Sequence, residues 1–181
     1  MTILYLTNKV FALGVIGSQI VMALLLIYVF LFQKRKHTIV DIISKHGILL
    51  AFLVALFSTL GSLFYSQIAG FEPCDLCWFQ RIFMYPGVVL LGLALLKKDS
   101  RIVDYMLSLS VIGFLISLYH NYIYYGGNGS SCQVFGRGVS CVKRYVFEFG
   151  YVTIPMMAAT SFLLVIVCLL LHKAYRKKSA T

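Results

Sequence analysis

Five long runs of apolar residues, separated by short polar segments, dominate the pattern of this chain. The runs cover residues 10–32, 47–69, 76–96, 102–122 and 151–171. A helix needs about 20 predominantly apolar residues to cross the hydrocarbon core of a bilayer, and each run has that length. The pattern therefore predicts five membrane-spanning helices in an all-α, multi-pass integral membrane protein.

The first run lies where a signal peptide would lie, but its features differ from one. Only Lys9 precedes it as a basic residue, and Lys34-Arg35-Lys36 follow it. The apolar part of a signal peptide has about 7–15 residues and ends at a small-residue cleavage site, whereas this run is longer and no such site follows. We expect a retained helix with its N-terminus outside the cytoplasm.

Basic residues gather in alternate connections between the runs. The loop 33–46, the turn 97–101 and the tail 172–178 hold 11 of the 16 Lys and Arg residues. The positive-inside rule places such segments in the cytoplasm, and we expect the tail to be disordered. The two segments that carry cysteine pairs, within 70–77 and 123–150, then share the extracytoplasmic face.

Composition agrees with this topology. Of the 181 residues 60% are hydrophobic and only 12% are charged, against about 25% charged in soluble domains. A net charge of +10 would point to nucleic acid in a soluble protein, but here the basic clusters between spans explain it. We expect no nucleic-acid partner, and a partner must supply any water-soluble redox domain.

Two cysteines separated by two residues stand at the start of the third run. If a helix begins at Pro73, then Cys74, Cys77 and Arg81 lie along one face, with Cys77 about one turn deeper. The helix N-terminus and the guanidinium both favour the reactive thiolate. Gln80 is expected on a different side from Cys77. The motif favours redox chemistry at a membrane surface; a stable disulfide or half of a zinc site remain alternatives.

A second pair, Cys132 and Cys141, lies in the Gly- and Ser-rich segment 123–150, with eight residues between the two cysteines. Zinc ligand pairs normally have shorter spacings, so this pair favours a disulfide in an oxidising compartment. A structural clip on an exposed loop is the simpler interpretation. An exchangeable disulfide close to the first pair is the functional one.

The sequence from Pro73 to Arg81, Pro-Cys-x-x-Cys-x-x-x-Arg, followed by the second pair, resembles the DsbB family. These are quinone-linked enzymes that reoxidise extracytoplasmic thiol oxidases, and the BdbC branch of Gram-positive bacteria is most similar. The resemblance covers residues 47–172. It implies a four-helix antiparallel bundle in the bacterial cytoplasmic membrane, with residues 1–46 as an extra helix and basic loop and 173–181 as a basic tail. The sequence assigns no role to the extra helix.

The resemblance also implies the residues' roles. Cys132 and Cys141 would exchange disulfides with a DsbA-like secreted thioredoxin-fold oxidase, and Cys74 and Cys77 would pass the electrons to ubiquinone or menaquinone. Arg81 would lie beside the quinone, and no metal is implied. The shorter spacing between the second-pair cysteines, compared with the best-studied branch, leaves the details of this relay open.

His120, among tyrosines near the outer end of the fourth run, is a candidate to bind a quinone carbonyl or is simply an interfacial residue. Pro86 is expected to kink the third helix. Rival functions are a vitamin K epoxide reductase-like quinone and thiol enzyme, whose order of cysteine pairs is reversed, and a non-enzymatic membrane scaffold with disulfide-stapled outer loops.

Overall fold

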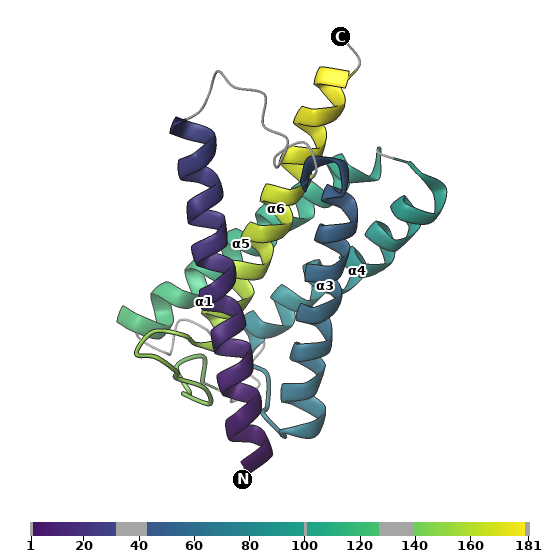
Figure 1. Cartoon of the computed structure of the whole chain (residues 1–181). Coiled ribbons are helices and arrows are strands. Elements are labelled where there is room, and N and C mark those ends of the chain that lie inside the picture. The colour runs from purple at the N-terminus through teal and green to yellow at the C-terminus, as the bar shows by residue number, and fades with distance from the viewer. Residues whose placement is uncertain (1, 32–42, 100, 127–139, 180–181) are drawn as a thin grey trace.

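The structure, a computed structural model, describes residues 2–31, 43–99, 101–126 and 140–179 and is almost entirely helical (Figure 1). Its elements are α1 (Thr2–Leu31), α3 (Gly47–Leu63), the π-helical turn η1 (Phe64–Ile68), α4 (Asp75–Lys97), α5 (Ile102–Gly126) and α6 (Ile154–Ser179). Among the described residues, five helices are long and apolar enough to cross a membrane, and the β-structure is one isolated bridge between Glu148 and Val152. The predicted all-α membrane fold is confirmed.

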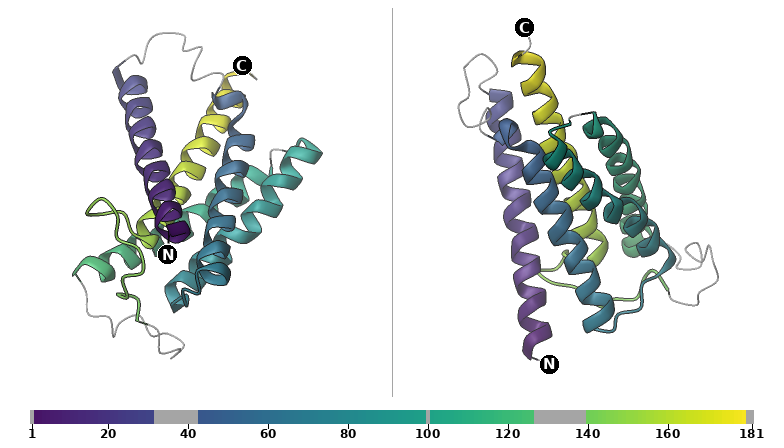
Figure 2. Two further views of the ribbon diagram at one scale, coloured as in Figure 1. Left: turned by 60° about the horizontal axis from the view of Figure 1, so that its bottom comes forward. Right: turned by 90° about the vertical axis from the view of Figure 1, so that its right-hand side faces the viewer.

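Four helices form an antiparallel bundle, and the fifth lies outside it. Helices α3, α4, α5 and α6 pack in a closed ring in which each contacts two principal neighbours, while α1 lies along the outside against α6 (Figures 1 and 2). Small residues allow close approach: a Cβ atom at Gly113 would lie 2.4 Å from the Phe162 ring. A hydrogen bond of 2.8 Å from Ser58 to Ser161 also joins α3 to α6.

Several predicted boundaries differ from the structure. Helix α1 already begins at Thr2 rather than at residue 10, and α6 begins at Ile154 rather than at residue 151. Helix α4 begins at Asp75, with Cys74 as its extended N-cap residue, so Pro73 lies before the first turn rather than within it. Helix α5 continues past residue 122 to Gly126. Helix α6 runs to Ser179, so the prediction of a disordered tail was wrong over the described residues. Lys and Arg are good helix formers, and Lys173 pairs with Asp104 at 2.7 Å, which together carry the helix beyond its apolar part.

The connections alternate between the two ends of the bundle as the charge pattern predicts. The segment between η1 and α4 and the segment before α6 lie at the same end as the N-terminus (Figure 1). The turn between α4 and α5 and the C-terminus lie at the other end. Cys74, Cys77 and Cys141 therefore belong to one end of the bundle, whereas Cys132 lies outside the described residues.

The candidate dithiol site and its apolar cavity

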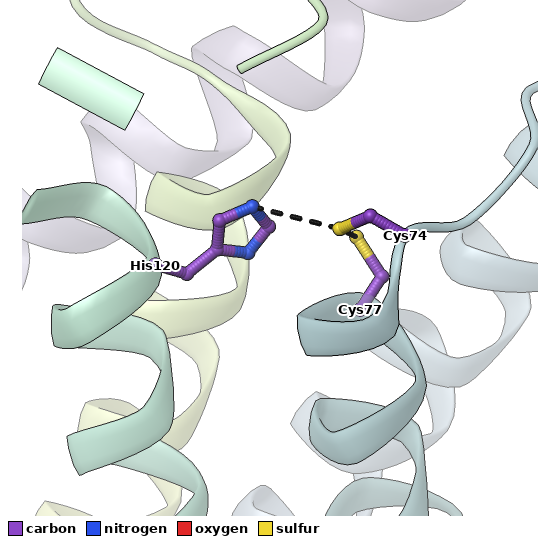
Figure 3. A group of neighbouring side chains, drawn as sticks. All are labelled: Cys74, Cys77 and His120. Carbon is purple, nitrogen blue, oxygen red and sulfur yellow. Dashed lines mark hydrogen bonds between the residues drawn. The ribbon is translucent and has the colours of Figure 1, made fainter. Parts of the chain in front are cut away.

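Cys74 and Cys77 form a close pair of free thiols at the start of α4 (Figure 3). Their sulfur atoms are 3.1 Å apart. Cys74 is the N-cap residue, and its carbonyl oxygen accepts the first helical hydrogen bond, from Trp78 at 3.1 Å. Because the helix starts one residue after Cys74, the extended backbone of Cys74 turns its side chain back towards Cys77. A small approach of the sulfurs would bring them to a disulfide bond length, about 2.05 Å.

His120 reaches the thiol pair from α5, with its ring directed at the sulfurs (Figure 3). Its side chain is buried, and Nε2 lies 3.8 Å from Cys74 Sγ and 3.4 Å from the carbonyl oxygen of Cys141. Nδ1 lies 3.1 Å from Nε2 of Gln80, whose amide donates to it. The neutral imidazole then carries its proton on Nε2, aimed at the sulfur and the carbonyl. His120 thus bridges the segments that carry the two cysteine pairs.

The position of Gln80 corrects the sequence analysis, which placed it on a different side of the helix from Cys77. Gln80 is three residues after Cys77, a spacing that puts two side chains on the same helix face. The amide is buried and orients His120. The spacing of three residues already indicates that Gln80 lies beside Cys77. A polar amide buried in a spanning helix also needs a hydrogen-bonding partner, so the sequence held enough information to find this residue.

The environment favours the thiolate form at Cys74. The hydrogen bond shared with Cys77 lowers the pKa of Cys74 to about 4, with a further lowering by His120, and the two together outweigh the opposing effect of burial. The thiolate is the species that attacks disulfides. The sequence analysis assigned this activation to the helix N-terminus and Arg81; in the structure the principal partners of Cys74 are Cys77 and His120.

The segment with Cys141 covers the thiol pair. Cys141 is buried and packs in one cluster with Cys74, Leu76 and Ile123. It is disulfide-bonded, whereas Cys74, Cys77 and Cys168 are free thiols. The predicted partner of Cys141 is Cys132, which is outside the described residues. Cys74 is only 5% exposed, because residues of this segment pack against it.

A stack of aromatic rings holds the covering segment in place. Phe71, in the segment before α4, lies between Tyr65 of η1 and Tyr145 of the Cys141 segment, with ring centroids 5.7 and 4.5 Å away. Gly70 turns the chain there with a positive φ of 70°, which glycine adopts without strain. This contact was not predicted from the sequence.

On the membrane side the thiol pair opens into an apolar cavity of about 550 Å³. Such a volume is in the range of small-molecule and cofactor sites. Polar side chains surround the thiol pair at what we call the thiol end, and the rest of the lining is largely apolar side chains of α1, α3 and α6, with a few hydroxyl groups such as those of Ser58 and Thr160. The residues of the thiol end are Cys74, Cys77, Gln80, Arg81 and His120.

Arg81 lines this cavity and is held mainly by α3. Its Nε donates to Ser62 Oγ at 3.0 Å and its second Nη to the Ser62 carbonyl oxygen at 3.2 Å, while the guanidinium lies over the Trp78 ring at 5.2 Å. Tyr85 also donates to Ser62 Oγ, at 3.2 Å. The sequence analysis missed Ser62 and Tyr85, because nothing in the order of residues shows that α3 presents a serine opposite Arg81.

Cys74, Cys77 and His120 also offer three metal-ligating atoms within 4.8 Å of one another. Two thiolates on a tetrahedral zinc ion, at about 2.3 Å each, are separated by about 3.8 Å. The sulfurs here are closer, at 3.1 Å. Their spacing suits a dithiol that closes to a disulfide better than a zinc site.

The family model of the disulfide bond formation protein DsbB matches residues 44–172, well over half of the chain. The chain belongs to the DsbB family. Members of this family catalyse thiol oxidation in a membrane, so the protein is an oxidoreductase of disulfide bond formation. This membership favours the DsbB interpretation over a vitamin K epoxide reductase-like enzyme and over a scaffold.

The alignments with curated relatives span most of the length of each relative. A probable disulfide formation protein C of Bacillus cereus is 46% identical over 129 residues, which are 69% of this chain and 90% of the relative. The disulfide bond formation protein C of Bacillus subtilis is 39% identical over 128 residues, 71% of this chain and 93% of the relative. Solved structures give no significant match. Helix α1 lies outside the DsbB family match.

Proposed function

We propose that this protein oxidises the dithiol of an extracytoplasmic, DsbA-like thioredoxin-fold oxidase and passes the two electrons to a quinone in the bacterial cytoplasmic membrane. The observation that carries the proposal is the position of one free thiol pair between two surroundings. Cys74 packs with disulfide-bonded Cys141 on the outer side, and both Cys74 and Cys77 line an apolar cavity between spanning helices. Such a pair can exchange with a disulfide and also meet an apolar acceptor.

Electrons pass from the partner to the acceptor in three steps, two thiol–disulfide exchanges and one oxidation. A partner thiolate attacks the Cys132–Cys141 disulfide at Cys132, and the partner's second thiol resolves the mixed disulfide, which leaves the loop pair reduced. A loop thiolate then attacks the Cys74–Cys77 disulfide, and the loop disulfide reforms as the CxxC dithiol is released. Finally the CxxC dithiol loses two electrons and two protons and closes again. Thiolates are the attacking species throughout, and the lowered pKa of Cys74 also makes it a good leaving group.

A quinone supplies an acceptor for two electrons and two protons that dissolves in lipid. The cavity fits such a ring: it is apolar, lies at the depth of the spanning helices and carries donors at the thiol end. Arg81, fixed by Ser62, would donate to a carbonyl oxygen that gains negative charge, and Gln80 and His120 would hold the thiol pair beside it. Preorganised donors of this kind stabilise developing charge without reorganisation.

The same arrangement defines the orientation that we propose. The end of the bundle with Cys74 and Cys141 faces the extracytoplasmic side, and the basic loop 33–46, the turn 97–101 and the tail face the cytoplasm, as the charge distribution requires. The family core of residues 47–172 carries the chemistry.

Replacing Arg81 tests the acceptor site. We expect Arg81→Met to raise the apparent KM for a water-dispersible quinone about 10- to 100-fold, the size of one lost charge-assisted hydrogen bond. Exchange between the partner and the loop disulfide should stay within about twofold, because Arg81 does not touch Cys141 in the described contacts. Arg101→Met, an exposed arginine in the opposite turn, is the matched control. Unchanged quinone kinetics in Arg81→Met would remove Arg81 from the site.

Replacing Cys141 tests the partner. In cells that express Cys141→Ser, the Cys132 thiol can attack an oxidised partner, and no neighbouring loop thiol remains to resolve the mixed disulfide. We expect a covalent adduct on non-reducing gels that reductant releases, with a thioredoxin-fold protein identified by mass spectrometry. The double variant Cys132→Ser, Cys141→Ser should give none. An adduct that persists in the double variant, or an attached protein without a thioredoxin fold, would contradict the proposed partner.

A further inference from the structure

Helix α1 forms part of the wall of the cavity, although it lies outside the family match. Five of its residues, from its outer and middle turns, line the cavity: Val10, Phe11, Gly14, Val15 and Ser18. Apolar side chains of α3, among them Leu50, Leu53 and Phe57, line it as well. Helix α1 packs on the outside of the bundle (Figure 2), so the cavity is shared between the bundle and this helix.

Specific contacts hold α1 in this position. Gln19 Nε2 donates to Thr160 Oγ1 of α6 at 2.8 Å, and Tyr151 donates to Gln19 Oε1 at 2.9 Å. Nearer the outer end, Lys9 Nζ lies 3.9 Å from Glu148 and 5.4 Å from the centre of the Phe149 ring. These bonds tie α1 both to α6 and to the segment that follows Cys141. Polar bonds between helices contribute to helix association in lipid, and these bonds help to fix α1 beside the opening.

The lining of the cavity combines polar side chains with apolar ones. Cys77, Gln80 and Arg81 belong to the polar part, and apolar side chains of α1 and α3 belong to the apolar part. A second, smaller apolar hollow continues between the same two helices, lined by Phe11 and by α3 and η1 residues such as Phe57 and Phe64. Val10 and Phe57 line the cavity and yet remain 60% and 65% exposed, so the cavity opens to the helix surface beside these α1 and α3 side chains. A ligand with a polar ring and a long apolar chain matches a cavity with both kinds of lining.

We propose that α1 and α3 together form the binding groove for the hydrocarbon tail of the quinone, so that α1 determines which acceptors the site takes. The inference rests on the proposed function. The quinone ring lies at the thiol end, and its tail leaves between α1 and α3. The extra helix is then a specificity-determining part of the acceptor site rather than only a membrane anchor.

Two glycines of α1 provide a matched test. Gly14 lines the cavity and Gly17 does not, yet a Cβ atom at either position meets no heavy atom within 4 Å. The first atom of a side chain therefore has open space at both positions, but only Gly14 belongs to the lining of the cavity. We expect Gly14→Trp to raise the KM for a quinone with a ten-carbon tail at least about 10-fold, with little change for the same ring without a tail. Gly17→Trp should leave both values unchanged.

A binding measurement complements the kinetics. The same quinone with a photoreactive diazirine at the end of its tail should attach to residues 10–18 on illumination, and excess unmodified quinone should suppress the adduct. Tail adducts confined to α4 or α5, or equal effects of Gly14→Trp on tailed and tail-less quinones, would overturn the assignment of the tail. Unchanged KM values for Gly14→Trp would remove α1 from the site. A wild-type protein that reduces neither quinone would instead overturn the proposed function, and the inference with it.

Discussion

Cys77→Ser should reduce quinone reduction to below about 1% of the wild-type rate, because closing the disulfide requires two sulfur atoms. Cys77 lines the cavity and its sulfur lies 3.1 Å from that of Cys74, and the third described free thiol, Cys168, is not among the lining residues. The change from sulfur to oxygen is small and keeps a hydrogen-bond donor beside Cys74. The helical fold and thermal stability in detergent should therefore be retained.

Cys168→Ser is the matched control for this experiment. Cys168 is also a free thiol, but it lies in the part of α6 that packs on the bundle core away from the thiol pair. Its replacement should leave quinone reduction within about twofold, as expected for a conservative change away from the site. Quinone reduction that survives in Cys77→Ser, with the protein folded, would contradict the dithiol mechanism. Loss of folding together with activity would favour a structural role for the pair.

The second large effect concerns the pH dependence of Cys74. Its pKa is lowered to about 4, so the thiolate predominates above that pH and is lost as the pH falls through it. An ordinary cysteine has a pKa of about 8.5 and is almost wholly protonated at pH 6, a difference of more than about 100-fold in thiolate fraction. We expect the rate of alkylation of Cys74 in the reduced protein, measured between pH 3 and 9 with mass spectrometry as the readout, to have its midpoint near pH 4.

Variants separate the causes of this shift. The hydrogen bond with Cys77 is the largest cause and His120 a smaller one, so Cys77→Ala should raise the midpoint more than His120→Ala, and both should raise it. His172→Ala is the control, since His172 contacts the Ser44 carbonyl oxygen near the other end of the bundle. A midpoint that stays near pH 4 in both Cys77→Ala and His120→Ala would show that other groups stabilise the thiolate.

Much of the architecture followed from local properties of the chain. Span length, the clusters of Lys and Arg and the separation of the two cysteine pairs predicted five helices and their alternation, because these features depend on the bilayer rather than on tertiary packing. The helix boundaries were less accurate. Pro73 fits the first turn by its backbone geometry alone, yet the helix begins two residues later, because Cys74 takes the N-cap position.

Contacts between helices decided which side chains of the site lie together. The approach of His120 to Cys74, the orientation of its ring by Gln80 and the anchoring of Arg81 by Ser62 join residues 19 or more positions apart. The hydropathy pattern of a spanning helix does not specify which of its polar residues faces which neighbour. Helix packing, governed here by small residues such as Gly113, sets those pairs.

The sequence by itself determined that this is a five-span membrane protein with two cysteine pairs, since bilayer thickness and cysteine spacing act through neighbouring residues. Only the tertiary structure decided that Cys141 covers Cys74, that His120 bridges them, and that α1 completes the wall of the cavity. The physical reason is that an apolar helix surface can pack in many ways in lipid. Close steric fit and a few buried hydrogen bonds select one of them.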